Sequence, residues 1–504
     1  MLAFLFSQLT GLVAKILIGA AFPAGFDLDA FYVANQPSES LLTIMAGGIL
    51  VSSFIPVFVK FLVKEDRRSA WLLASGTANL ILLIMISLAA LEAIFAKPLV
   101  QYLLGAGFSP EKQSLTINLL RIQAISIVFF GLSGLIIGIL NSHQKFLMSA
   151  LAPAMYNLGQ IFGVLVLARW MGIYGLAWGV VIGSALSLLI QIPSLLRLKG
   201  QYHPTLGFRN PSVTEVFRLM GPRMFGAAVV QLMVWVNTLL ASHMLPGSVY
   251  SLRLGFSLMM IAWAIIAQSI ATAAMPTFSA QFAQGRLDEI RKTLASTLRG
   301  VLLLAIPATF GLILLRVPII AMVFQRQAFT ADTTQMVAWA LLWYTVGLVF
   351  HSVLEVLVRA YYAMHDTKTP VLVGAGAMTL SIGLSLLFSN LFTAIGWPPY
   401  GGLALAVSVS TALEVTTLFL IMRKRLNGIH GLEIAKGFGA AALGTLVMSA
   451  ALVIWMQVTG SVHAALTTVG GVAIGGAVYA VTVVVLRIPE VGSLVQMVKR
   501  RLSR

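Results

Sequence analysis

Three basic residues, Lys15, Arg223 and Arg253, lie within stretches of the sequence that are otherwise strongly apolar. A charged side chain at the centre of a membrane helix costs about 2.5–3.5 kcal/mol on insertion scales, so such residues usually face a water-filled cavity. Arginine binds phosphate through a bidentate fork, whereas lysine binds it as a point charge. A cavity holding these three side chains would therefore suit an anionic phosphate head group better than a cationic solute.

Acidic and polar side chains occur in the same kind of stretch. Glu355 follows His351 by one helical turn, Arg359 extends that face by another turn, and Glu414 lies in a later apolar stretch. We include Glu355 among the candidate cavity residues. The remaining polar groups in apolar stretches are amides, which most often join helices by hydrogen bonds: Gln160, Gln191, Gln231, Asn237 and Gln268.

Each charged candidate also has a purely structural interpretation. Arg223 and Arg253 lie near the ends of their stretches and could extend to a membrane surface, an alternative that stays open. For Glu355 and Arg359, the favoured interpretation is an ion pair between the two. Lys15 lies about two-thirds along its stretch, where a cavity role is favoured.

The composition indicates that the helices carrying these residues lie in a membrane. Of 504 residues, 59% are hydrophobic and 10% are charged, whereas soluble domains carry about 25% charged residues. The net charge of +17 would suggest a nucleic-acid partner in a soluble protein, but basic cytoplasmic loops explain it here, so we expect no nucleic acid. There is no cysteine, the seven histidines show no metal-binding spacing, and no phosphate-binding glycine loop is present. We therefore expect that the protein is not an enzyme and that it has no cofactor and no metal site.

The hydropathy pattern predicts an all-α polytopic membrane protein with fourteen transmembrane helices. Each stretch has the length needed to cross a bilayer, about 20 residues. The predicted spans are 1–22, 39–61, 71–95, 116–140, 147–168, 173–196, 219–243, 249–279, 293–315, 333–358, 369–393, 400–422, 434–458 and 464–486.

The basic residues alternate between successive loops. Of the 33 lysines and arginines, 24 fall at 60–68, 145, 197–218, 286–299, 359–368, 423–436 and 487–504, which lie on one side of the predicted membrane. The alternate loops hold only six. Cytoplasmic loops carry the excess of basic residues, so the pattern predicts a cytoplasmic-membrane protein with both termini in the cytoplasm.

The sequence repeats itself at an offset of six predicted spans. Pro56 and Pro276 lie in similar segments, as do Phe108 and Phe329. An even offset gives the two halves the same orientation, as in transporters that bind substrate between two lobes and alternate their access. We predict a six-helix lobe at 1–200, a second at 201–428, and two further helices with a basic cytoplasmic tail at 429–504.

Several longer segments resemble the MurJ (MviN) family of lipid II flippases, within the multidrug/oligosaccharidyl-lipid/polysaccharide exporter superfamily. The segments are DAFYVA at 29–34, GILNSHQKFLMSALAP at 138–153, MGPRMFGAAVVQLMVWVNTLLAS at 220–242, QRQAFTADTT at 325–334 and RAYYAMHDTKTP at 359–370. The resemblance covers nearly the whole chain.

The resemblance implies an activity and a partner. It implies movement of lipid II, the lipid-linked peptidoglycan precursor, from the inner to the outer leaflet of the bacterial inner membrane. The head group would sit in a cationic cavity, helices 13 and 14 would hold the lipid tail, and an ion gradient or the membrane potential would drive transport. It also adds Asp29 to the candidate site and matches Arg253 to a family arginine.

The first predicted helix departs from the family pattern S-R-x-x-G-x-x-R-[DE]. Gln8 and Ala14 stand at the arginine positions and Lys15 at the acidic one, while Gly47 stands where a glutamate is expected. These departures keep two alternatives open. One is a flippase or exporter for another polyprenyl-linked glycan or a small solute, and the other is a transport-inactive scaffold for envelope synthesis.

Overall fold

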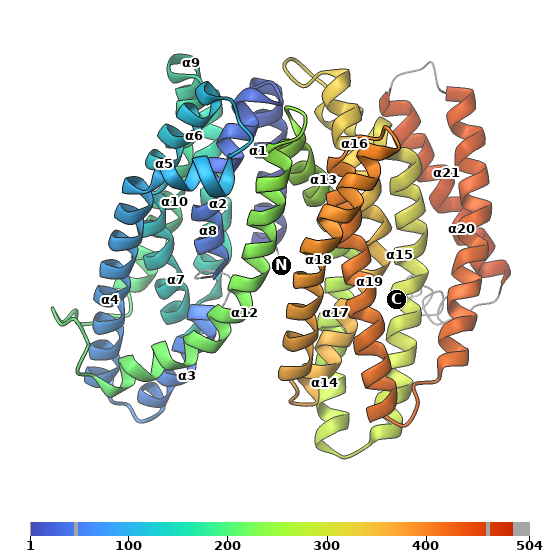
Figure 1. Cartoon of the computed structure of the whole chain (residues 1–504). Coiled ribbons are helices and arrows are strands. Elements are labelled where there is room, and N and C mark those ends of the chain that lie inside the picture. The colour runs from blue at the N-terminus through green and yellow to red at the C-terminus, as the bar shows by residue number, and fades with distance from the viewer. Residues whose placement is uncertain (1, 45–48, 460–463, 487–504) are drawn as a thin grey trace. The chain divides into compact units, whose positions relative to one another are not determined.

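The computed structural model describes residues 2–44, 49–459 and 464–486 (Figure 1). Gly47 and the predicted basic tail beyond residue 486 lie outside the described residues. Within them the chain is 86% helical and contains no strand, which confirms the all-α prediction. The chain divides into two compact units, Met1–Tyr250 with Arg326–Thr330, and Ser251–Gln325 with Ala331–Arg504. The lobe boundaries drawn from the repeat stay a prediction.

The first unit contains the helices up to the start of α13, some of them interrupted by π-helical turns (η). They are α1 (Leu2–Ala21), α2 (Phe26–Ile44), α3 (Leu50–Val63), α4 (Arg67–Ile94), α5 (Ala96–Pro98), η2 (Leu99–Leu104), α6 (Pro110–Gln123), α7 (Ser126–Ser142), α8 (Phe146–Phe162), η3 (Gly163–Leu167), α9 (Ala168–Met171), α10 (Ile173–Leu189), α11 (Ile192–Leu196) and α12 (Pro211–Ser242).

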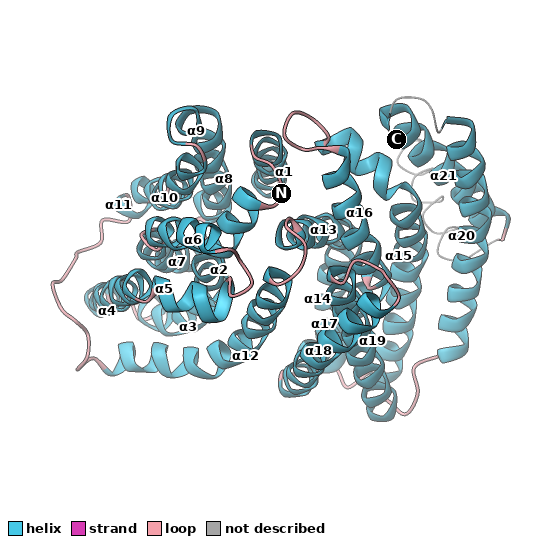
Figure 2. Cartoon of the chain, turned by 45° about the horizontal axis from the view of Figure 1, so that its top comes forward, coloured by secondary structure: helices cyan, strands magenta, loops and turns pink. Residues whose placement is uncertain are grey.

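The second unit contains most of α13 and all later helices. They are α13 (Ser248–Trp263), η4 (Ala264–Gln268), α14 (Ser269–Ala283), α15 (Leu287–Phe324), α16 (Ala331–Val346), α17 (Leu348–Ala363), α18 (Lys368–Ala394), α19 (Tyr400–Arg425), α20 (Gly431–Thr459) and α21 (Ala464–Val485). Within this unit α20 and α21 pack against each other and against α15 (Figure 2).

Ten helical segments of the described chain are long and apolar enough to cross a membrane, or twelve if two bent pairs each count as one span. The bends are 43° within α12 and 44° between α16 and α17. The chain is thus a multi-pass membrane protein, and the number fourteen stays a prediction.

The second helix begins earlier than its hydropathy predicts. The apolar pattern places its start at 39, whereas α2 begins at Phe26. Its polar side chains turn inward, so that Asp29, Asn35 and Gln36 are at most 2% exposed. A hydropathy window scores such residues as unsuited to lipid, but here they face protein instead of lipid.

Glycines let α8 and the π-helical turn η3 that follows it approach α10 at backbone distance in the first unit. A Cβ added to Gly159 would lie 2.1 Å from Cα of Gly183, and one added to Gly163 would lie 2.7 Å from Cα of Gly179. Helices in membranes associate mainly by close packing, which small residues permit. The closely packed α8 and α10 in turn support α1, which packs on α8.

Candidate functional site

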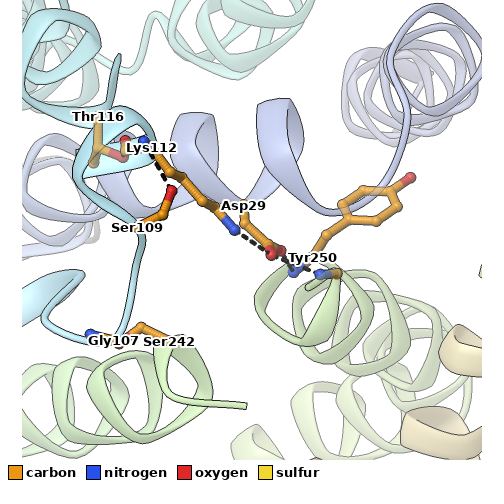
Figure 3. A network of polar contacts seen from close by, with 8 residues as sticks. Asp29, Gly107, Ser109, Lys112, Thr116, Ser242 and Tyr250 are labelled. Carbon is orange, nitrogen blue, oxygen red and sulfur yellow. Dashed lines mark hydrogen bonds and ion pairs between the residues drawn. The ribbon is translucent and has the colours of Figure 1, made fainter. Parts of the chain in front are cut away.

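A buried carboxylate lies at the centre of a polar network in the first unit. Asp29, in the first turn of α2, is 1% exposed. Its Oδ2 accepts hydrogen bonds from Nζ of Lys112 at 2.9 Å and from the backbone N–H of Gly247 at 2.7 Å, and its Oδ1 accepts one from the N–H of Tyr250 at 2.9 Å (Figure 3). The carboxylate therefore caps the start of α13, where the helix dipole favours a negative charge.

Lys112 is the basic partner of this carboxylate. It lies in the first turns of α6, is 6% exposed, and places its Nζ 3.8 Å from the centre of the Phe108 ring. Nearby, the N–H of Gly107 donates to Oγ of Ser242 at the end of α12. The network thus ties the loop before α6 to α2, to the end of α12 and to the start of α13.

Aromatic rings continue the network toward α1. The Tyr250 ring stacks on Tyr32 and meets Phe329 edge-on, with centroid distances of 5.6 and 6.3 Å. Gly19 of α1 lies against this cluster, since a Cβ there would be 2.7 Å from the Tyr250 hydroxyl. The N–H of Ala328 also donates to the carbonyl of Ala20, which explains why 326–330 belongs to the first unit.

Lys15 lies one turn before Gly19 on α1 and is half-buried. The adjacent face of α1 packs on α8, where the Asn157 amide donates to the carbonyl of Ser7 and to the hydroxyl of Thr10. Ala14, at one expected arginine position, is 1% exposed within this packing. The longer side chain of an arginine at position 14 would not fit into this packing. The basic residue of α1 is instead Lys15, the next residue, which points about 100° further round the helix.

Arg223 is exposed on α12 and contacts two hydroxyl groups of α3. Its guanidinium donates to Oγ of Ser52 at 2.8 Å and to Oγ of Ser53 at 3.1 Å. Neutral partners leave its positive charge uncompensated by these two contacts. The structure therefore places Lys15, Asp29 and Arg223 in the first unit, on three different helices.

Arg253 and Glu355 lie in the second unit. Arg253 is half-buried on α13. Glu355 accepts from Nε and Nη2 of Arg359 at 2.9 and 2.8 Å, across one turn of α17. This confirms the predicted ion pair, in which the charge of Glu355 is largely compensated by Arg359.

The motif at 359–370 forms a helix cap. Asp366 lies just before α18 and accepts from the backbone N–H of Lys368 and of Thr369, the first two residues of that helix. Its Oδ2 accepts from the Thr369 hydroxyl and from Arg425 at 2.6 Å each. Partial burial raises the pKa of Asp366, but the hydrogen bonds from Thr369 and Arg425 outweigh it and lower the pKa to about 2. This motif thus joins α18 to the end of α19.

Sequence reasoning missed Lys112 as a site residue because it was assigned to a loop. The nearest signal in the sequence is the similarity of the segments around Phe108 and Phe329. Nothing in the linear sequence pairs residue 112 with residue 29, or residue 29 with residues 247 and 250.

The chain is similar to known proteins along most of its length. A family model described as lipid II flippase MurJ matches residues 18–469. The chain is 30% identical over 429 residues to a lipid II flippase MurJ of Burkholderia cenocepacia, covering 84% of this chain and 82% of that protein. It is 29% identical over 506 residues to a probable lipid II flippase MurJ of Vibrio cholerae, covering 94% and 92%.

Solved structures agree with the sequence comparison. A lipid II flippase MurJ in an inward closed conformation superposes with a TM-score of 0.83 and 25% identity, covering 96% of this chain and 98% of that one. An inward-facing multidrug resistance transporter of the MATE family gives 0.70 at 14% identity, a likeness of fold alone.

Proposed function

The chain belongs to the MurJ family of lipid II flippases, and we propose that it carries lipid II from the inner to the outer leaflet by alternating access. The observation that carries this proposal is the match of family and fold along nearly the whole chain. The family is one of transporters, and the chain is a multi-pass protein of the bacterial inner membrane.

We further propose fourteen spans with both termini in the cytoplasm. The twelve segments already counted, together with α1 and the α2–α3 pair, support that number. The alternation of basic loops supports the orientation. Helices 1–6 and 7–12 would form the two lobes, and α20 with α21 would be the additional pair.

The cationic side chains are proposed to bind the pyrophosphate of lipid II. Lys15 and Arg253 are half-buried in spanning helices, and Arg223 offers a guanidinium held only by hydroxyls in its two described contacts. A charge-assisted hydrogen bond to phosphate contributes about 1.5–3 kcal/mol. An ion gradient or the membrane potential is the proposed driver, since no nucleotide-binding loop occurs in the sequence.

Complementation of a MurJ-depleted bacterium tests the flippase function. We expect the intact chain to restore growth and cell shape. Failure of a well-expressed, correctly inserted protein would contradict the proposal.

Lys15→Ala and Arg253→Ala are each expected to lower the transport rate about 10- to 100-fold, because each removes one charged contact to phosphate. Growth rescue at matched membrane levels measures the effect, with Lys64→Ala as the control because Lys64 is exposed in a loop. Full rescue by both variants would show that neither Lys15 nor Arg253 is needed for transport. The transport-inactive scaffold is instead favoured if the well-expressed intact chain itself fails to rescue growth.

A different polyprenyl-linked glycan is the second candidate substrate. The observation that favours it is the presence of Gln8 and of the packed Ala14 where family arginines are expected. Growth rescue by the intact chain argues against this candidate, because rescue requires lipid II itself to move.

A further inference from the structure

A cavity of about 620 Å³ lies in the first unit between α2, α4 and α12. Its lining is almost entirely apolar and includes Leu41, Leu88 and Leu232. A volume of this size is typical of a small-molecule site. None of the basic residues considered above belongs to its lining.

One carboxyl group interrupts this apolar lining. Glu92 of α4 is 7% exposed, and its Oε1 is buried without a hydrogen-bond partner among the described residues. No described ion pair includes it, and no lysine, arginine or histidine lines the cavity. Burying a carboxylate without a partner is strongly unfavourable, so Glu92 can carry a charge in this cavity only where a ligand supplies a cationic donor.

The other polar side chains of the cavity contact one another. Ser40 accepts from the indole N–H of Trp235 at 2.9 Å, and its hydroxyl lies 2.9 Å from the Gln231 side-chain oxygen. These three residues form a hydrogen-bonded group on α2 and α12, and the Ser40 hydroxyl also contacts the carbonyl of Gln36 at 2.8 Å. Glu92 is thus the acidic group of the cavity, and its Oε1 can accept a hydrogen bond from a ligand.

The position of Glu92 along α4 points to a lipid. Glu92 lies two residues before the end of α4, which has 28 residues. The ends of a helix long enough to cross a bilayer lie at the depth of the lipid head groups. The neighbouring lining residues Leu91, Phe95 and Leu232 are 49%, 52% and 58% exposed, so the cavity opens on an apolar surface that hydrocarbon would cover. Arg121 donates through Nε to the carbonyl of Ala93, which adds a cation at the same end of α4.

We propose that this cavity binds a membrane phospholipid with a primary ammonium head group. The ammonium donates to Glu92, an acyl chain fills the apolar lining, and the phosphate lies toward Arg121. The site is independent of lipid II recognition, because none of the proposed head-group residues lines it. It gives the flippase a binding preference among the lipids that surround it.

Lipid binding to the purified full-length protein tests this proposal by native mass spectrometry in neutral detergent. The probes are dioleoyl-phosphatidylethanolamine and dioleoyl-phosphatidylcholine, which share acyl chains and phosphate but differ in their ability to donate N–H. We expect the wild type to prefer the ethanolamine lipid about tenfold. Glu92→Gln should abolish that preference, because the neutral amide no longer attracts an ammonium group.

Two further variants serve as controls for the site of binding. Glu414→Gln changes a buried acidic residue of the second unit and should leave the preference intact. Ala228→Phe fills the cavity while keeping Glu92, and should weaken binding of both lipids. Equal binding of the two lipids by the wild type, or an unchanged preference in Glu92→Gln, overturns the proposal. If Glu92→Gln does not fold, undiminished binding by Ala228→Phe overturns it as well.

Discussion

Replacing Lys112 by methionine is expected to destabilise the protein by about 3–5 kcal/mol, because removing one partner of a buried ion pair leaves an uncompensated charge. Methionine keeps much of the side-chain volume but cannot donate to Asp29, whose carboxylate would keep only the N–H groups of Gly247 and Tyr250. Thermal unfolding of the purified protein in detergent measures the loss. Because the network also positions the start of α13, we expect growth rescue to fail at matched protein levels.

The control for this substitution is Lys145→Met, since Lys145 is exposed in a loop. That variant should unfold at the wild-type temperature. The double variant Asp29→Asn with Lys112→Met should recover part of the stability, because no buried charge is then left unpaired. If Lys112→Met is as stable as Lys145→Met, the ion pair does not hold this region together.

The second large effect is expected from Gly159→Ala. The added Cβ would meet Cα of Gly183 at 2.1 Å, and backbone atoms cannot move aside as side chains do. Helices α8 and α10 must separate, which costs about 1–3 kcal/mol for overpacking and also loosens the support of α1. Thermal unfolding and the yield of folded protein from membranes measure the change.

The matched control is Gly311→Ala in α15, where an added Cβ meets no atom within 4 Å. There the same substitution should leave stability unchanged or raise it slightly, since alanine favours the helix over glycine. Equal behaviour of the two variants would show that the α8–α10 contact does not require glycine.

The helical class and the family could be predicted because both depend on signals local in sequence. Apolar stretches of membrane length identify spanning helices without reference to their neighbours. The segments 138–153 and 359–370 resemble the family as short continuous motifs, and in the second Asp366 forms a helix cap with residues close to it in sequence. The Glu355–Arg359 pair was predictable for the same reason, since both residues lie on one helix.

Contacts between distant segments could not be predicted in this way. Lys112 is separated from Asp29 by 83 positions, and no periodicity relates them. The start of α2 at Phe26 could not be predicted from hydropathy, because the polar side chains of its first half are buried against protein and not exposed to lipid. Glu92 was counted simply as part of an apolar span, since its missing partner is visible only once α2 and α12 lie beside α4.

The central claim is that this chain moves lipid II, and reconstitution in liposomes tests it most directly. Purified protein is reconstituted with labelled lipid II, and the fraction that reaches the opposite leaflet is measured over time against protein-free liposomes. We expect lipid II to change leaflet faster with the wild-type protein than in protein-free liposomes, and about 10- to 100-fold more slowly with Arg253→Ala than with the wild type. The flippase function would be contradicted if folded protein moved lipid II no faster than protein-free liposomes do, while it moved another polyprenyl-linked glycan.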